Sequence, residues 1–228
     1  GSSDINPLTT LVEEYLVAYA GAGAVTASEA SAAISAALGL PTGVDLRFFD
    51  PLDATNSITT DGINVQKAAA QVATLQTLVV NSQTTALNAE AAVASVTQKL
   101  IESIKSVTDG TTISVDLTDS SQITALVAGV TSGNIGSLVS DTDTANSSIG
   151  AASNISNISQ AQTSALDDIS PILGGLGLTV ATDSGASATD SITKFSAAIL
   201  RVSLDVTATN GSASVIGDTI KTTQDGVS

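Results

Sequence analysis

The 228-residue sequence contains no cysteine, histidine, methionine or tryptophan. The absence of cysteine excludes disulfides, thiolate metal sites and cysteine catalysis. The absence of histidine removes the usual general base and the commonest ligand of transition metals. A glycosidase uses two carboxylates, and the sequence contains pairs such as Glu13-Glu14 and Asp167-Asp168. Neighbouring residues on a helix point in different directions, however, so these pairs would not face one substrate. We therefore expect no enzyme, no catalytic residue and no bound cofactor.

Aromatic residues are almost absent, at 2% of the chain. The hydrophobic content is 43%, and Ala, Val, Leu and Ile supply most of it. Small aliphatic side chains fill the seam between closely packed helices better than a deep interior. The composition therefore favours a long and slender helical fold.

Basic residues are scarce, and the formal net charge is −15. The seven basic residues are Arg47, Lys67, Lys99, Lys105, Lys194, Arg201 and Lys221. Nucleic-acid binding requires a clustered positive face, so scattered cations exclude it and disfavour anionic membrane surfaces. No run of 18 apolar residues occurs, and we expect no membrane insertion. The surplus of acid suits either solubility or the binding of divalent cations, and we favour solubility.

The first 60 residues predict two helices and an ordered loop. Pro7 is a favoured first helical residue with Asn6 as its cap, and an apolar stripe runs from Leu8 to Tyr19. A second helix opens with the capping-box pattern Thr26–Glu29 and ends at Gly39. The loop 40–52 carries Phe48 and Phe49, which we expect to anchor it to neighbouring helices.

The strongest periodic signal lies in residues 65–107. Apolar residues recur there at intervals of seven, at Val65, Val72, Val79, Ala86, Val93, Leu100 and Val107. A second series follows three residues later, at Ala68, Leu75, Ser82, Ala89, Val96 and Ser103. This heptad pattern would be about 64 Å long as one helix. Ser82 weakens the seam, so the pattern allows either one helix or two helices joined near residues 81–85.

Weaker patterns follow. Alternation from Thr112 to Leu117 predicts a short extended segment, and Asp119 begins another helix. A second long periodic stretch runs from Ala145 to Ile172, and a last helix is predicted over Ile192–Val206. Residues 207–228 are linker-like.

These patterns predict an all-α fold, an elongated antiparallel bundle of long helices with room for one small β-ribbon. We expect residues 1–60 to form an N-terminal helical pair and ordered loop. Residues 61–206 should form the long-helix bundle, continuous with 1–60 as one domain, before the C-terminal linker-like segment 207–228. The heptad seam is expected to pack within the chain.

Acidic residues crowd the segment before the heptads. Asp45, Asp50, Asp53, Asn56 and Asp61 offer the oxygen ligands that calcium takes. The alternative is that these side chains cap helices and shape turns. Their spacing matches no EF-hand loop, and we favour the second interpretation, which leaves Asp45, Asp50, Asp53 and Asp61 as weak calcium candidates.

Several segments together resemble a known family. They are Asn6–Val12, Leu38–Pro41, Asp45-Leu46, Phe49–Leu52 and Val65–Val72. The series is similar to a helical module of giant bacterial surface proteins and adhesins, which are exported by type I secretion beside cadherin-like or calcium-binding repeats. The resemblance covers residues 6–80 and implies an extracellular, non-enzymatic role at the bacterial cell surface. It carries no functional residues, and the chain lacks the glycine-aspartate nonapeptides of calcium-repeat proteins.

We therefore expect a structural spacer or self-association module of an adhesin or matrix protein, with neighbouring domains of the parent protein as partners. One alternative is a glycan- or peptide-binding adhesion module, for which Phe48, Phe49 and Tyr15 are the candidate lining residues. Another is a filament or surface-layer subunit, which would carry an apolar patch complementary to another face of the same molecule.

Overall fold

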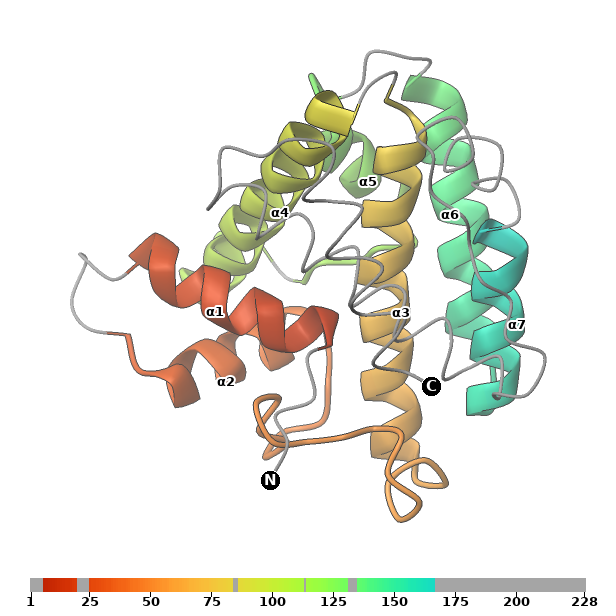
Figure 1. Cartoon of the computed structure of the whole chain (residues 1–228). Helices are drawn as coiled ribbons and strands as arrows, with labels where there is room; N and C mark the ends of the chain where they lie inside the picture. Colours follow the sequence, from red (N-terminus) through yellow and green to blue (C-terminus); the bar gives the residue numbers. More distant parts are fainter. Residues whose placement is uncertain (1–5, 20–24, 84–85, 113, 131–134, 167–228) are drawn as a thin grey trace.

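The computed structural model describes residues 6–19, 25–83, 86–112, 114–130 and 135–166 (Figure 1). Its helices are α1 (Pro7–Tyr19), α2 (Ala27–Ala37), α3 (Thr60–Asn81), α4 (Ala86–Thr108), α5 (Ser120–Val127), α6 (Ile135–Ala151) and α7 (Ile155–Leu166). The prediction of an all-α fold is confirmed, since no strand occurs in these described ranges.

The small β-ribbon for which the sequence left room does not occur in the described residues, and the extended segment predicted at residues 112–117 forms no strand where it is described. In the described part of this segment, the Thr112 amide donates to the Ser106 carbonyl of α4 at 3.3 Å, and the Val115 amide donates to the Ala37 carbonyl of α2 at 2.8 Å. The apolar side chains of Val115 and Leu117 are buried as anchors of a connection between α4 and α5. Alternation therefore reflected burial of every second residue without a partner strand to pair with.

Local capping bonds set the start of α1 and α2, as the sequence predicts. The Asn6 carboxamide oxygen accepts bonds from the amides of Leu8 at 2.8 Å and Thr9 at 3.0 Å. At α2, Thr26 and Glu29 complete the capping box, with the Thr26 amide donating to Glu29 at 2.8 Å. Each cap satisfies backbone amides that have no partner within the helix.

The connection between α2 and α3 is held to the core, but only one of its two phenylalanines takes part. Leu46 is buried, and its amide donates to the Ser31 hydroxyl at 2.9 Å. Phe49 packs partly buried against the core. Phe48, however, is 80% exposed, so the prediction that both rings anchor the loop is wrong for Phe48.

The heptad segment forms two helices, α3 and α4. Helix α3 ends at Asn81, where the Ser82 hydroxyl donates to the Val79 carbonyl at 2.7 Å. The chain then reverses, and the Gln76 side chain donates to the Thr97 hydroxyl across the two helices at 3.0 Å. Most of the heptad positions are buried in the seam, and the polar Ser82 falls at the turn.

The periodic stretch predicted from Ala145 to Ile172 is likewise divided between two helices in its described part. Helix α6 ends at Ala151, and α7 starts at Ile155 after a turn. The Asn154 side chain caps the new helix by accepting from the Asn157 amide at 2.9 Å. An asparagine that bonds the backbone in this way competes with helix continuation. The continuation to Ile172, the helix predicted over Ile192–Val206 and the segment 207–228 lie outside the described residues.

Helix α3 occupies the centre of the described structure, in contact with α1, α4, α6 and α7 (Figure 1). The main buried cluster includes Leu8 and Ile34 as well as Val72 and Leu100. The described residues before α3 therefore share one core with the helices that follow. No helix in the described part is long and apolar enough to cross a membrane.

Candidate functional site

The acidic side chains between α2 and α3 were the sequence's candidates for a calcium site. Asp45 pairs with Arg47, whose Nε donates to Asp45 Oδ1 at 2.8 Å and whose Nη2 contacts Oδ2. The hydrogen bond from the guanidinium lowers the pKa of Asp45 below its ordinary value. Arg47 also lies over the Phe48 ring, 4.9 Å from its centroid. The Asp45 carboxylate thus already has a cationic partner.

The carboxylates of Asp50 and Asp53 each accept a hydrogen bond from the backbone amide two residues later in the sequence. The Leu52 amide donates to Asp50 at 2.8 Å, and the Thr55 amide donates to Asp53 at 2.8 Å. The bonds from the side chain and backbone of Thr55 lower the pKa of Asp53. Both arrangements are Asx turns, in which a carboxylate takes the place of a backbone carbonyl.

The remaining two candidates lie apart from these turns. Asn56 donates its side-chain amide to the Asp50 carbonyl at 2.7 Å, which closes the loop on itself. Asp61 is exposed in the first turn of α3, where the helix dipole favours a negative charge. Within the described ranges, no group of three or more acidic side chains is arranged to hold a metal ion. Calcium binding by these residues stays a prediction for experiment.

The basic side chains of the described part bond to the protein itself. Lys67 Nζ donates to the Gly150 carbonyl at 2.9 Å, at the end of α6. Lys99 Nζ reaches the carbonyls of Ala125 and Ala128 at the end of α5. Lys105 pairs with Asp109 four residues on. Lysines at helix C-termini satisfy terminal carbonyls and complement the negative end of the helix dipole.

The candidate aromatic lining is divided between different environments. Tyr15 is 3% exposed and packs at a tilt of 51° against Tyr19, with ring centroids 4.8 Å apart, so its ring belongs to the core. Phe49 is partly buried, whereas Phe48 is exposed beneath the Arg47 guanidinium. Of the three rings, only that of Phe48 is presented to solvent.

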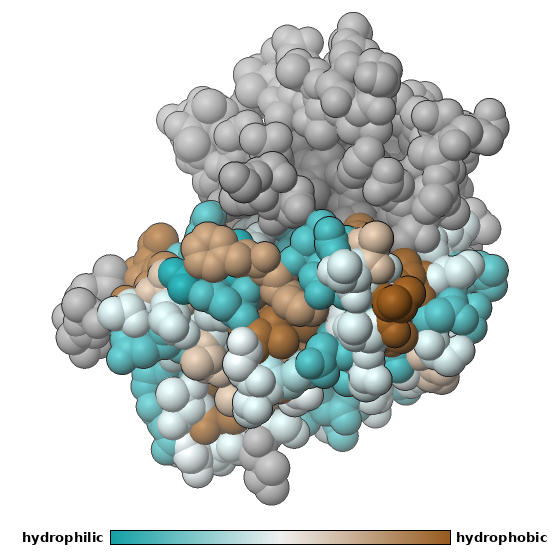
Figure 2. Space-filling model, turned by 90° about the horizontal axis from the view of Figure 1, so that it is seen from below, coloured by the Kyte–Doolittle hydropathy of each residue, from teal (hydrophilic) through white to brown (hydrophobic). Residues whose placement is uncertain are grey.

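Exposed apolar side chains occur on the α2–α3 connection. Phe48 is 80% exposed and Ile58 is 82% exposed. Figure 2 views the molecule from this end and shows separate hydrophobic patches between hydrophilic residues. Ile58 lies two residues before the α3 start, in a segment that the Asp53 and Asn56 bonds hold in place.

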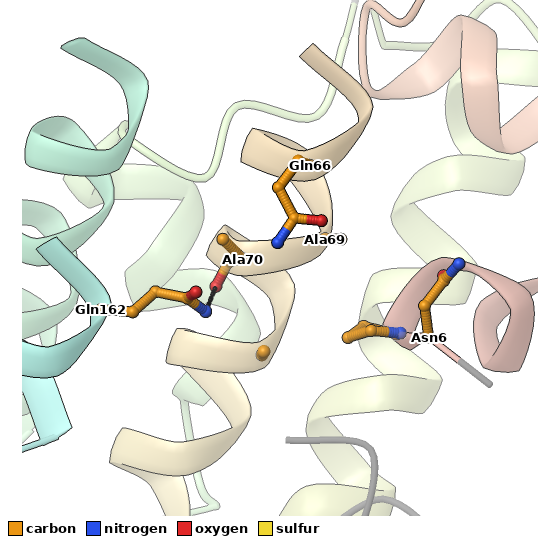
Figure 3. A pocket seen from close by; sticks show the side chains of 7 residues that line it. Asn6, Gln66, Ala69, Ala70 and Gln162 are labelled. Carbon is orange, nitrogen blue, oxygen red and sulfur yellow. Dashed lines mark hydrogen bonds between the residues drawn. The ribbon is translucent and has the colours of Figure 1, made fainter. Parts of the chain in front are cut away.

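A small pocket lies along α3, between the start of α1 and helix α7 (Figure 3). Its cavity volume is about 10 Å³, which is room for about one water molecule, and it is lined by Asn6, Pro7, Gln66, Ala69, Ala70, Ala73 and Gln162. Gln162 donates its side-chain amide to the Ala70 carbonyl at 3.5 Å. The sequence analysis missed this pocket. Its only signal there is Gln66, a polar residue next to a heptad position.

No protein-family model, curated protein or solved structure that was compared with this chain matches it.

Proposed function

We propose that this chain is a non-enzymatic structural module of an extracellular bacterial adhesin or matrix protein, and that it acts as a spacer that also self-associates. The observation that carries self-association is the pair of exposed apolar side chains on the α2–α3 connection, Phe48 and Ile58. Asx turns fix the backbone around them, so docking a partner there orders little additional chain. A second copy, or a neighbouring domain of the parent protein, would bury both side chains.

The spacer role is supported by how the polar side chains are used. Lys67 and Lys99 satisfy the ends of other helices, and Asp45, Asp50 and Asp53 hold turns. Such bonds fix the relative positions of elements, which is the property a spacer requires. The placement at the bacterial cell surface rests on the resemblance of residues 6–80 to adhesin modules.

Sedimentation velocity over a wide range of concentrations tests self-association. The expected result is a sedimentation coefficient that rises with concentration for the native chain and stays constant for the Phe48→Ser, Ile58→Ser double variant. Val17→Ser is the matched control, because Val17 is 75% exposed but lies on α1. A single species at every concentration would contradict self-association. Growth without limit would instead identify a filament or surface-layer subunit.

The elongated shape expected of the bundle belongs to the same proposal. A compact chain of 228 residues has a radius of gyration of about 17 Å. Small-angle X-ray scattering at low concentration should give a clearly larger value for an elongated spacer. A value near that of a compact chain would contradict elongation.

A glycan- or peptide-binding module is the second candidate, and the exposed Phe48 ring is the observation that favours it. An exposed aromatic ring is a platform on which a sugar or a proline-rich peptide can stack. Screening the native chain against a glycan array, with Phe48→Ser as control, separates this candidate from a spacer. Specific binding that Phe48→Ser abolishes would replace the structural proposal.

A further inference from the structure

Helix α7 lies at the edge of the described structure, where it contacts α3 and α6 (Figure 1). Its buried side chain Ile158 belongs to a small cluster with Ala70 of α3 and with Ile149 and Ala152 near the end of α6. This cluster is separate from the main buried cluster, which includes no described residue of α7. Movement of α7 away from α3 would therefore leave the main buried cluster intact.

The polar contacts of α7 at this interface are poorly completed. Gln162 donates its side-chain amide to the Ala70 carbonyl at 3.5 Å, which is long for a hydrogen bond (Figure 3). Ser159 is 2% exposed, and its hydroxyl oxygen has no hydrogen-bond partner in the described part of the chain. A buried polar group without a partner carries a desolvation cost. The attachment of α7 should therefore open at a lower free energy than the main core.

The connection between α6 and α7, residues 152–154, contains neither proline nor glycine. The break is made instead by the Asn154 side chain, which caps α7 by accepting from the Asn157 amide at 2.9 Å. Apolar residues continue across the break at the helical gap of three, at Ile149, Ala152, Ile155 and Ile158. The same segment can consequently form a turn or the middle of one continuous helix.

In a continuous helix, Ile149 and Ile158 would point in opposite directions. They are nine residues apart, and nine steps of about 100° place their side chains about 180° apart around the helix axis. Ile149 would keep its place on its own α3, whereas Ile158 would face away and need another apolar surface. The surface that fits Ile158 is the one it covers in the monomer, presented by the α3 of a second copy.

We propose that α7 exchanges between two copies of this chain, with residues 152–154 as the hinge. In the exchanged dimer, α6 and α7 form one helix, and each α7 packs on the α3 of the other copy. The contacts of α7 with Ala70 are reused between the chains, so the dimer needs no new complementary surface. This inference is independent of the proposed self-association through Phe48 and Ile58, which does not require α7 to move.

A proline in the hinge tests the exchange. The full chain is warmed at high concentration to just below its melting temperature, cooled and diluted, and its mass is measured by size-exclusion chromatography with light scattering. The native chain should give a dimer that survives dilution, because its return to monomer requires α7 to detach again. Ser153→Pro should lower the association constant by about a hundredfold or more, since proline does not fit inside a continuous helix. Ser153 is exposed and lies outside both helices, so the monomer accommodates this change.

The opposite change in the hinge should favour exchange. The Ser153→Ala, Asn154→Ala double variant removes the cap of α7 and introduces good helix formers, so the association constant should rise by about tenfold or more. The Phe48→Ser, Ile58→Ser double variant is the matched control and should form the warmed dimer as the native chain does. Loss of the dimer in this control would assign it to the exposed apolar side chains instead. Circular dichroism checks that the monomer of each variant keeps its helices.

A mixture of two blocked chains tests which surfaces meet in the dimer. Ala70→Asp places a charge on α3 and Ile158→Asp places one on α7, so neither chain alone has an intact contact between these helices. In a mixed dimer, α7 of the Ala70→Asp chain meets the native α3 surface of the Ile158→Asp chain. Warming the two chains together should therefore give a mixed dimer, identified by native mass spectrometry, at about ten times the yield of dimer from either chain alone.

Two results from the hinge variants would overturn the proposal. These are a native chain that stays monomeric after warming, and a Ser153→Pro variant that dimerises as readily as the native chain. The absence of mixed dimers from blocked chains that keep their helices would overturn it as well.

Discussion

Short polar side chains organise this protein at the scale of single residues. Asn6, Asp119 and Asn154 each accept bonds from backbone amides at the start of a helix. Asp50 and Asp53 perform the same task in turns. Because these bonds reach only two or three residues along the chain, they do not depend on distant packing.

The first residue-scale prediction concerns calcium. Asp45 is paired with Arg47, and the Asp50 and Asp53 carboxylates are used in separate turns. We expect the melting temperature to be the same in millimolar calcium and in equal magnesium at fixed ionic strength, with chelator as the baseline. A rise specific to calcium that Asp50→Asn abolishes would show instead that these carboxylates converge on the ion.

The second residue-scale prediction concerns how the contribution of Asp45 to stability depends on pH. Arg47 lowers the pKa of Asp45 in the folded state, so the pair stabilises the fold above the ordinary value of 3.8. This contribution is lost as the pH falls through the lowered folded-state pKa. The effect is small because both side chains are about one-third exposed. Asp45→Asn should therefore lower the urea midpoint slightly at neutral pH and not at all in strong acid.

Arg47→Met is the companion variant for this measurement, because it removes the same pair from the other side. Its urea midpoint should be lowered slightly at neutral pH, as for Asp45→Asn, and should equal that of the native chain in strong acid. A difference from the native chain that persists at low pH would mean that Asp45 stabilises the fold by other means.

At the scale of elements, side chains on one helix complete the ends of another. Helices α5 and α6 have no basic residue in their last turns. Lys99 from α4 and Lys67 from α3 reach their terminal carbonyls instead. In a chain with a net charge of −15, these lysines are placed where a helix end is negative.

Lys67→Met tests this role while keeping the apolar stem. The Gly150 carbonyl would lose its charged donor, so we expect the free energy of unfolding to fall by about 1–2 kcal/mol. Lys105→Met is the matched control, since its partner Asp109 is about half exposed just after the end of α4 and the loss of this pair should cost less. Chemical denaturation measures the free energy of unfolding of both variants. Equal losses would indicate a general effect of removing positive charge.

The α3–α4 seam is tested by Val93→Asp. Val93 is 3% exposed within the core, and a charge placed there should cost about 3 kcal/mol or more. Ala94→Asp is the control, because Ala94 is the next residue of α4 and is exposed. Thermal melting should separate the two variants clearly. An unchanged melting temperature for Val93→Asp would place this face of α4 in solvent.

At the scale of the whole molecule, the main buried cluster joins helices from both sides of residue 60. Ile34 of α2 and Leu100 of α4 are each at most 1% exposed and belong to the same cluster. A core shared in this way makes separate unfolding of residues 1–60 unfavourable, because it would expose the apolar faces of α3 and α4.

We therefore expect one cooperative unfolding transition by circular dichroism. Ile34→Ala and Leu100→Ala should each lower its stability by about 2–5 kcal/mol. Both substitutions should shift the whole transition. Two transitions, of which Ile34→Ala moves only one, would show that residues 1–60 form a separate unit.

Sequence alone determined the helical class and the starts of α1, α2 and α5. The caps at Asn6, Thr26 and Asp119 are local, so their residue types and spacing are visible in the sequence. The heptads likewise identified the buried faces of α3 and α4, because a helix repeats its surface at a fixed period.

Only the tertiary structure decided where the long periodic stretches break and what the remaining side chains contact. A heptad stripe looks the same in one helix and in a reversing pair, since both bury the same face. The partner of Lys67 lies 83 residues away, and that of Gln162 lies 92 residues away. Phe48 and Phe49 are neighbours of the same type, yet only one faces the core. Such outcomes depend on which helices meet, and that choice is made by the packing of the whole core.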